Sequence, residues 1–466
     1  MKTLFLFFVF CAQAHSTIYL TVSGANVRRA KLALGVVHPL PESGNTDPQL
    51  ARNIREQLRA DLEFSNLFEF ISESSFSKYD VATDYNKIKF EDYAPFGAAF
   101  TLKLAYRLVS GKLSVEAYLF DIPGQKKIFG TKYQYPAVQY YKLVHAISED
   151  ILKELTGEKG LFSSRILMTC WAYPFKKSPP KEVYAVDPDG RNLTQLTTDK
   201  TLSTSPSWMS DGKNITYTQF DWVKRGGMRT RGVVIKKHNL QTGQRTLLSA
   251  REGMNSGMAW SPVGNMGAAT LSFTGRPEIY LIGSNGGDPD PLSRNIQWRR
   301  LAGDGFQSGA VNLLFDVEPN WSPDGKKIVF SSARTGHPMI YVVDLASKVA
   351  NQLTFAGQYN ASPSWSPRGD KILFAAQKTG EGNFDIYMID PDGNNLSRMT
   401  VGDNRPGRRI NSENPTWAPT GRHFAFANNE DGRYGIYIMT VDSTHKTKIS
   451  PPDKECFTPS WGPMEN

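Results

Sequence analysis

Residues 319–330 read PNWSPDGKKIVF, and this stretch decides the fold. It predicts a strand, a tight turn and a second strand. Pro323, Asp324 and Gly325 suit the turn, because proline presets φ, aspartate bonds its own backbone and glycine accepts the positive φ that closes a hairpin. The β-branched and aromatic side chains of Lys327–Phe330 then favour a strand.

The same pattern recurs through the rest of the chain at a spacing of roughly 50 residues. Each copy has a tryptophan before the turn, and two further predicted strands follow the hairpin. Self-similarity at this spacing, with four strands in each unit, is typical of the blades of a β-propeller. The tryptophans are Trp208, Trp260, Trp321, Trp365, Trp417 and Trp461.

The two ends of the repeat region are predicted to complete one blade. Residues 165–197 supply a second, third and fourth strand without a first strand, and Trp461 lies in a first strand with no others after it. Joining these parts gives six blades. Closure in this way removes the open sheet edges that would otherwise template aggregation.

Residues 15–160 are predicted to form a separate α/β domain. Asp47 and Pro48 suit the N-cap and first position of a helix. Apolar residues alternate over Ala99–Val109, which indicates a strand, and they follow a helical period over Val138–Leu155. The expected fold class is therefore an N-terminal α/β domain followed by an all-β six-bladed propeller at residues 161–466.

The first 14 residues are predicted to be an export signal. Lys2 supplies the charge and Leu4–Phe10 the apolar core. The small residues of Ala12–Ala14 provide a cleavage site, so we expect the mature chain to begin after Ala14 and to work outside the cytoplasm. Cys11 raises a lipoprotein alternative, but the phenylalanine before it is too large for that cleavage. The sequence shows no other segment apolar enough to cross a membrane.

The formal net charge of +9 is mild for 466 residues. The densest basic stretch is Lys224–Arg231, which interrupts the repeat of Trp208, and a second insertion holds Trp298–Arg300. Solvated loops are the favoured interpretation, and a surface for an anionic partner is the alternative. Nucleic acid is not expected, because the chain has no binding motif and is predicted to be exported.

A search for chemistry assigns no catalytic and no metal-binding residue. No G-x-S-x-G motif is present, and the seven histidines are scattered singly, without the spacing of metal ligands. The Asp-x-Asp-Gly turns lack the further carboxylates of a calcium loop, and turn chemistry explains them. Two other classes of function stay open, an enzyme and a glycan-binding protein. A propeller hydrolase or lyase needs titratable groups that converge on the axis, and a glycan binder needs exposed aromatic residues there.

The order of these parts resembles the TolB family of the Tol–Pal envelope system. An export signal, an α/β domain and repeats of the PSWSPDGK type together cover nearly the whole mature chain. Peptidase-associated propellers share the repeat alone, and Met258 and Val263 depart from it. The resemblance implies a periplasmic, non-enzymatic scaffold without a cofactor, which supports outer-membrane integrity and constriction at cell division. We expect a monomer that meets membranes only through its partners.

The resemblance further implies that a Pal-like peptidoglycan-associated lipoprotein binds over one mouth of the propeller. Positions that match Gly257 and Val317 lie in this contact in the family. Equivalent positions of successive blades form a ring, so we expect the residues just upstream of each tryptophan strand to build the face. The alternative is that these residues only cap strand ends. The candidates are Thr204, Ser205, Asn255, Gly257, Val317, Glu318, Asn360, Ser362, Glu413 and Asn414.

A second implied partner is a TolA-like protein anchored in the inner membrane, reached through the mature N-terminus. The candidate residues are Ile18, Tyr19, Leu20, Thr21 and Val22. The aliphatic residues Ile18, Leu20 and Val22 alternate with Tyr19 and Thr21, which is typical of a strand. A free strand can add to the edge of a partner's sheet. An ordinary edge strand of the α/β domain is the alternative.

The two cysteines of the mature chain, Cys170 and Cys456, are predicted to form a disulfide. Exported proteins meet oxidising conditions, and two cysteines are an even count. Two buried free thiols are the alternative, which a register error of one residue would produce by turning the side chains to opposite faces.

The register of this prediction comes from a complete repeat. In the predicted hairpin, pairing Trp365 with Lys371 sets Asn360 opposite Ala376. Alignment of the repeats places the two cysteines at these last two positions of the composite blade. Residues directly opposite in an antiparallel pair lie about 4.5 to 5.5 Å apart at Cα, within reach of a disulfide.

Overall fold

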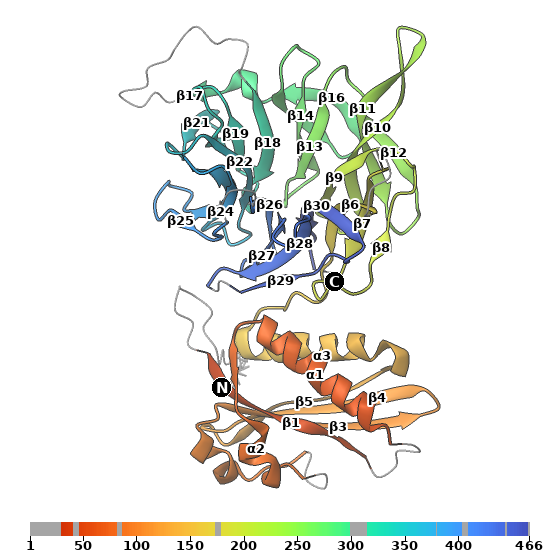
Figure 1. Cartoon of the computed structure of the whole chain (residues 1–466), viewed down its shortest axis with the longest axis vertical. Coiled ribbons are helices and arrows are strands. Elements are labelled where there is room, and N and C mark those ends of the chain that lie inside the picture. The colour runs from red at the N-terminus through yellow and green to blue at the C-terminus, as the bar shows by residue number, and fades with distance from the viewer. Residues whose placement is uncertain are drawn as a thin grey trace, which may run out of the picture. The chain divides into compact units, whose positions relative to one another are not determined.

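The computed structural model describes most of the chain, which divides into two compact units at Gly160–Leu161 (Figure 1). The described residues are 29–40, 46–81, 86–172, 179–298, 315–378, 380–402, 409–442 and 445–464. The predicted export signal and the predicted adhesive strand, Ile18–Val22, lie outside these ranges. No helix within them is long and apolar enough to span a bilayer.

The N-terminal unit is one sheet with two long helices. The strands lie in the order β2-β1-β3-β4-β5, and β1 runs parallel to β2 and β3. The strands are β1 (Ala30–Pro39), β2 (Phe68–Phe70), β3 (Phe100–Val109), β4 (Lys112–Asp121) and β5 (Lys126–Pro136). The helices are α1 (Pro48–Phe64), α2 (Glu73–Phe76) and α3 (Tyr140–Thr156), with short 3-10 turns at η1 (Ser77–Tyr79), η3 (Phe90–Asp92), η4 (Ala94–Phe96) and η5 (Ala137–Gln139).

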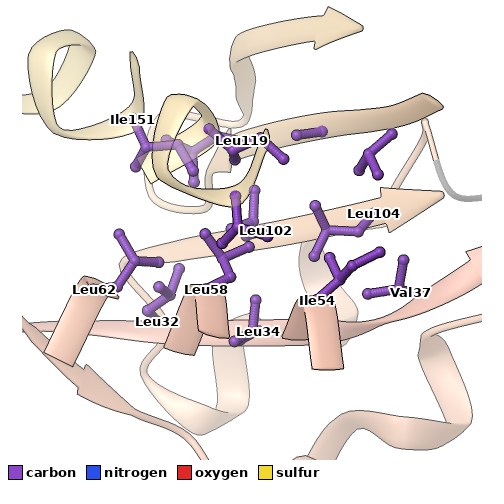
Figure 2. Packing of buried hydrophobic residues seen from close by; sticks show 14 of the residues in the cluster. Leu32, Leu34, Val37, Ile54, Leu58, Leu62, Leu102, Leu104, Leu119 and Ile151 are labelled. Carbon is purple, nitrogen blue, oxygen red and sulfur yellow. The ribbon is translucent and has the colours of Figure 1, made fainter. Parts of the chain in front are cut away.

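Helix α1 begins where the sequence predicts. The Asp47 carboxylate accepts hydrogen bonds from the backbone N–H groups of Gln49 and Leu50, which caps the first turn. One face of the helix is fully buried, and Figure 2 shows Ile54 and Leu58 directed toward leucines of the sheet. The unit therefore has a core of its own between the sheet and the long helices.

The second unit is a propeller of six sheets, as the repeats predict. Blade I is β9 (Ser203–Trp208), β10 (Asn214–Arg225), β11 (Met228–Asn239) and β12 (Arg245–Ser249). Blade II is β13 (Asn255–Trp260), β14 (Met266–Leu271), β15 (Glu278–Gly283) and β16 (Gly286–Pro291). Blade III is β18 (Asp316–Trp321), β19 (Lys327–Ser332), β20 (Met339–Asp344) and β21 (Val349–Gln352), with β17 (Gln297–Trp298) added at its outer edge after η6 (Ser293–Asn295).

The last three blades include the composite one. Blade IV is β22 (Tyr359–Trp365), β23 (Ile372–Gln377), β24 (Phe384–Ile389) and β25 (Ser397–Arg398). Blade V is β26 (Ser412–Trp417), β27 (His423–Asn428), β28 (Gly435–Thr440) and β29 (Lys446–Lys448). Blade VI joins β30 (Lys454–Trp461) from the C-terminal part of the chain to β6 (Ile166–Ala172), β7 (Glu182–Val186) and β8 (Thr194–Gln195).

In three blades the indole N–H of the repeat tryptophan bonds to the blade before it. The indole N–H of Trp321 donates to the carbonyl oxygen of Ala259 at 3.1 Å, and that of Trp417 donates to Ser364 at 3.0 Å. Both indoles are buried. A buried indole needs a partner for its N–H, and the neighbouring blade supplies it. Trp365 donates instead to the carbonyl oxygen of Gly369 in its own hairpin, and Trp461 donates to Ser164 Oγ. Blade-to-blade hydrogen bonding therefore explains the tryptophan in part of the repeats.

The predicted pairing within the blade IV hairpin is partly wrong. Trp365 pairs with Ile372 rather than with Lys371. A β-bulge in β22 then shifts the register by one residue, so that Asn360 does lie opposite Ala376. The two deviations cancel at the position on which the cysteine alignment depends.

Blade VI has the same pairing, and Cys456 of β30 lies opposite Cys170 of β6. The structure joins the two cysteines by a disulfide with their Cα atoms 4.2 Å apart. The residues beside them, Trp171 and Phe457, stack with ring centroids 5.0 Å apart. The closing blade is therefore held by strand pairing, aromatic packing and a covalent link.

Candidate functional site

The first strands of the six blades form a closed ring around the propeller axis. Each of β9, β13, β18, β22, β26 and β30 contacts the next, and β30 contacts β9. All six carry a β-bulge ahead of the tryptophan. The propeller thus repeats one local backbone distortion in each blade, next to the axis.

The residue three positions before each tryptophan has a left-handed backbone in every blade. Such a conformation costs a non-glycine residue on the order of 1–3 kcal/mol and persists only where the surrounding structure enforces it. Five of the six residues are not glycine. The φ angles are 49° at Ser205, 63° at Gly257, 56° at Glu318, 50° at Ser362, 52° at Asn414 and 46° at Thr458.

Polar side chains of this ring contact one another from blade to blade. Asn414 Nδ2 donates to Ser362 Oγ at 3.1 Å. Ser362 donates in turn to the Glu318 carboxylate, from its backbone N–H at 2.6 Å and from its hydroxyl at 3.1 Å. Burial raises the pKa of Glu318, although the two hydrogen bonds from Ser362 oppose this rise. The centre of the face is therefore polar, with hydrogen bonds that link three successive blades.

The structure brings eight of the ten candidate residues together on this ring as half-buried side chains or backbone. They are Thr204, Ser205, Gly257, Val317, Glu318, Ser362, Glu413 and Asn414, which lie three or four positions before a tryptophan. Tyr434 donates a hydrogen bond to Glu413 at 2.8 Å, and burial raises the pKa of the Glu413 carboxyl.

Asn255 and Asn360 lie five positions before their tryptophans and are fully buried inside their blades. The Asn255 amide oxygen accepts a hydrogen bond from Ser249 Oγ at 2.6 Å. The Asn360 amide nitrogen donates to Thr354 Oγ1 at 2.9 Å and to the Ala356 carbonyl oxygen at 3.1 Å. These two side chains support the loops that enter the first strands.

Exposed apolar side chains surround the same end of the blades, and the sequence analysis did not single them out. They belong to the connections that lead into the first strands or to the start of those strands. Their exposed fractions are 41% for Leu202, 40% for Met254, 61% for Phe355, 39% for Tyr359 and 78% for Val401. Their shared place immediately upstream of the repeats is the signal that could have identified them.

The other end of the first strands holds a cavity of about 280 Å³. It is lined by the six repeat tryptophans and by the serine, proline and small residues that follow them, and none of the lining side chains is ionisable. General acid–base catalysis needs a titratable group within hydrogen-bonding reach of the substrate. Within the described ranges, no group of three or more His, Cys, Asp or Glu residues could hold a metal ion.

Comparison with known proteins matches both units to one family. A family model described as the TolB beta propeller domain matches residues 152–465, and one described as the TolB amino-terminal domain matches residues 19–128. The chain belongs to the TolB family. The resemblance stated from the sequence is therefore confirmed.

Individual relatives agree with this membership. A protein named TolB homolog from Chlorobium chlorochromatii is 32% identical over 289 residues, which is 62% of this chain and 58% of that protein. The Tol-Pal system protein TolB of Desulfosudis oleivorans is 30% identical over 58% of each chain. The chain thus spans somewhat more than half the length of these curated relatives.

A solved TolB structure supports the fold. The crystal structure of TolB from Acinetobacter baumannii superposes with a TM-score of 0.73 at 22% sequence identity. The match covers 96% of this chain and 100% of the other.

Proposed function

We propose that this chain is a periplasmic, non-enzymatic scaffold of a Tol–Pal envelope system. It would bind a Pal-like lipoprotein over the propeller mouth at which the first strands begin, and a TolA-like inner-membrane protein through its N-terminal strand. Membership of the TolB family supports a role in a Tol–Pal system, and the name of the Desulfosudis relative contains the term Tol-Pal system. The function would be to maintain the outer membrane and its constriction at division.

One observation carries the choice of mouth. A half-buried polar ring with blade-to-blade hydrogen bonds lies inside a rim of exposed apolar side chains, at the same end of the propeller. Exposed apolar side chains can supply buried contact area to a protein partner, and the polar groups of the ring can orient it through hydrogen bonds. The opposite mouth offers tryptophans whose N–H groups largely serve the blades themselves.

The ring and the rim can also be compared with what an enzyme or a glycan-binding protein would need. The ring holds two carboxyl groups, Glu318 and Glu413, which lie three and four positions before their tryptophans. Burial raises the pKa of both. The aromatic rim residues Phe355 and Tyr359 precede or open β22, away from the ring position. This arrangement favours a protein partner with a polar backbone segment at the axis.

Arginine substitutions at Gly257 and Val317 test the face. The double variant Gly257→Arg/Val317→Arg should bind a Pal-like lipoprotein at least about 100-fold more weakly, because two long charged side chains would fill the mouth. Calorimetric titration of the purified mature chain with the lipoprotein's soluble domain measures this. The melting temperature should fall by only a few degrees, since the five other blades place an ordinary side chain at the conformation of Gly257.

Val263→Arg is the matched control. Val263 belongs to the turn after Trp260 in the same blade and is 53% exposed at the other mouth. This variant should bind the lipoprotein as the unaltered chain does. Unchanged binding by Gly257→Arg/Val317→Arg would rule out the proposed face, and weaker binding by Val263→Arg would move the face to the other mouth.

The N-terminal strand is tested separately. Deletion of residues 15–22 should abolish capture of a TolA-like protein and leave binding of the Pal-like lipoprotein intact, because an added strand binds through its main chain. Leu20→Pro removes one backbone N–H and should weaken capture, whereas Leu20→Val should not. A pull-down with each variant measures this. Capture of the TolA-like protein by the truncated chain would show that the strand is not the site.

A further inference from the structure

Blade I carries a two-stranded arm, and no other blade has one among the residues that the structure describes. Strands β10 and β11 each have 12 residues, against six in β14 and β15 of the next blade. β9 pairs with β10 only as far as Gln219, and β12 pairs with β11 only from Ile235. Residues 220–233, here called the arm, therefore extend past their neighbours, and Figure 1 shows this hairpin projecting from the propeller.

One face of the arm combines aromatic and basic side chains. The register pairs Trp222 with Arg231 and Lys224 with Arg229, and directly opposed residues share a face. The guanidinium carbons of Arg229 and Arg231 lie 5.0 Å and 4.9 Å from the centroid of the Trp222 ring. Arg231 also lies 5.6 Å from the ring of Phe220. The two arginines thus flank an indole that is itself 48% exposed.

The positive charge on this face is not neutralised within the arm. Its one carboxylate, Asp221, points to the other face and pairs with Lys236 Nζ at 2.6 Å. The structure records no ion pair for Arg229 or Arg231 among the residues it describes. At the tip, the side chain of Met228 is 74% exposed. This face of the arm therefore presents two guanidinium groups, without a recorded ion pair, beside the exposed rings of Trp222 and Phe220. Met228 pairs with Arg225 at the tip, on the opposite face of the hairpin.

We propose that the arm docks on a bilayer surface that contains anionic lipids. Arg229 and Arg231 would bind headgroup phosphates, for which the guanidinium fork is well shaped. Trp222 and Met228 would enter the headgroup layer, where amphipathic aromatic side chains are favoured. Each basic residue near an anionic surface contributes about a fivefold gain in partitioning.

A bilayer fits the arm better than a soluble polyanion does. A polyanion would use the basic residues and leave Trp222 and Met228 exposed to water. A peptide partner would find a convex two-residue tip, Gly226-Gly227, instead of a groove. A projecting tip with apolar and basic groups side by side suits a flat, negatively charged interface. The proposal differs from the expectation that membranes are met only through partners.

Flotation of the mature chain with lipid vesicles tests the proposal. The chain should float with vesicles of phosphatidylcholine that contain about a third phosphatidylglycerol and not with phosphatidylcholine alone, and added salt should release it. Arg229→Gln/Arg231→Gln should lower partitioning by roughly 30-fold, and Trp222→Ser/Met228→Ser by about tenfold or more. Because the arm lies outside the blade cores, the melting temperatures should match that of the unaltered chain.

Lys326→Gln/Lys327→Gln is the matched control, since it removes the same charge from an exposed turn at the other mouth. It should float like the unaltered chain. Failure of the unaltered chain to float with anionic vesicles, or equal loss in this control, would overturn the proposal. The proposal would also fail if the chain bound soluble heparin as strongly as it binds vesicles and if Trp222→Ser/Met228→Ser left the heparin binding unchanged. That result would identify a site for soluble polyanions instead. Lipoprotein binding uses other residues, so either proposal can fail alone.

Discussion

Breaking the bond between Cys170 and Cys456 is expected to destabilise the propeller more than any other single change considered. The bond joins residues 286 positions apart in the sequence. In the chain-entropy account, closing a loop of that length in the unfolded state is worth about 5 kcal/mol. A change of this size lowers the melting temperature by roughly 10 °C.

The reduced propeller should still close, because other contacts hold blade VI. β30 remains paired with β6, and the Trp461 indole N–H donates to Ser164 Oγ at 2.8 Å. The Phe457 ring also packs on Tyr434 of the neighbouring blade, with centroids 4.2 Å apart. Reduction therefore frees the unfolded chain from the restriction that the disulfide places on its conformations. The noncovalent contacts of the folded blade stay in place.

Thiol titration of the denatured, unreduced mature chain tests the bond directly. No free thiol is expected, and two free thiols would refute the disulfide. Cys170→Ala/Cys456→Ala should melt at the same temperature with and without reductant, whereas the unaltered chain should melt lower in reductant. A reductant effect of equal size in the alanine variant would trace the loss to something other than this bond.

The closure was predictable because it depends on counting and alignment. An incomplete unit at 165–197 and a lone Trp461 strand have one joint solution, and the structure contains it. The cysteine register was correct although the pairing of Trp365 was one residue off. A β-bulge that offsets this error of one residue recurs in every blade. Alignment of one blade with another therefore included the offset, although the sequence did not reveal the bulge.

The candidate face was less predictable, for a related physical reason. A bulge breaks the alternation of inward and outward side chains, so counting back from a tryptophan gives the wrong face beyond it. Asn255 and Asn360 were grouped with the ring although they point into the blades. The left-handed backbone was hidden because Ser, Glu and Thr occupy it in four blades, and only Gly257 and Asn414 are residues typical of it.

The arm shows what pattern alone cannot decide. The basic run Lys224–Arg231 is visible in the sequence, and solvated loops were its favoured interpretation. Its register places Trp222 between two arginines, and this juxtaposition depends on the length of the hairpin and on the position of its turn.

The second large effect is expected at Glu278, at the start of β15 in blade II. Its carboxylate is 2% exposed. Arg276 Nε and Arg294 Nε donate to it at 2.9 Å and 2.8 Å. Thr274 Oγ1 and the Tyr280 hydroxyl donate at 3.0 Å and 3.1 Å. Burial acts to raise the pKa of Glu278, but these four hydrogen bonds outweigh it and hold the pKa below its usual value.

The sign of the pH dependence follows from this lowered pKa. Between the two pKa values the unfolded chain binds more protons than the folded chain, so stability rises with pH in that window. The contribution of Glu278 is complete above the unfolded pKa of 4.5 and is lost as the pH falls through the folded pKa. Glu278→Ala should therefore cost about 3 kcal/mol at neutral pH, because it leaves two arginines and two hydroxyls without their acceptor.

Urea unfolding of Glu278→Ala and of the unaltered chain at a series of pH values measures this difference. The gap between the two should be widest near neutral pH and should narrow as the pH drops below about 4.5. Asp288→Asn is the matched control, because Asp288 lies in the same blade and its side chain is fully exposed. Its stability should follow the unaltered chain throughout, since an exposed ion pair contributes little. A gap at Glu278 that stays constant into strong acid would show that the site acts through packing and that its charge contributes nothing to folding.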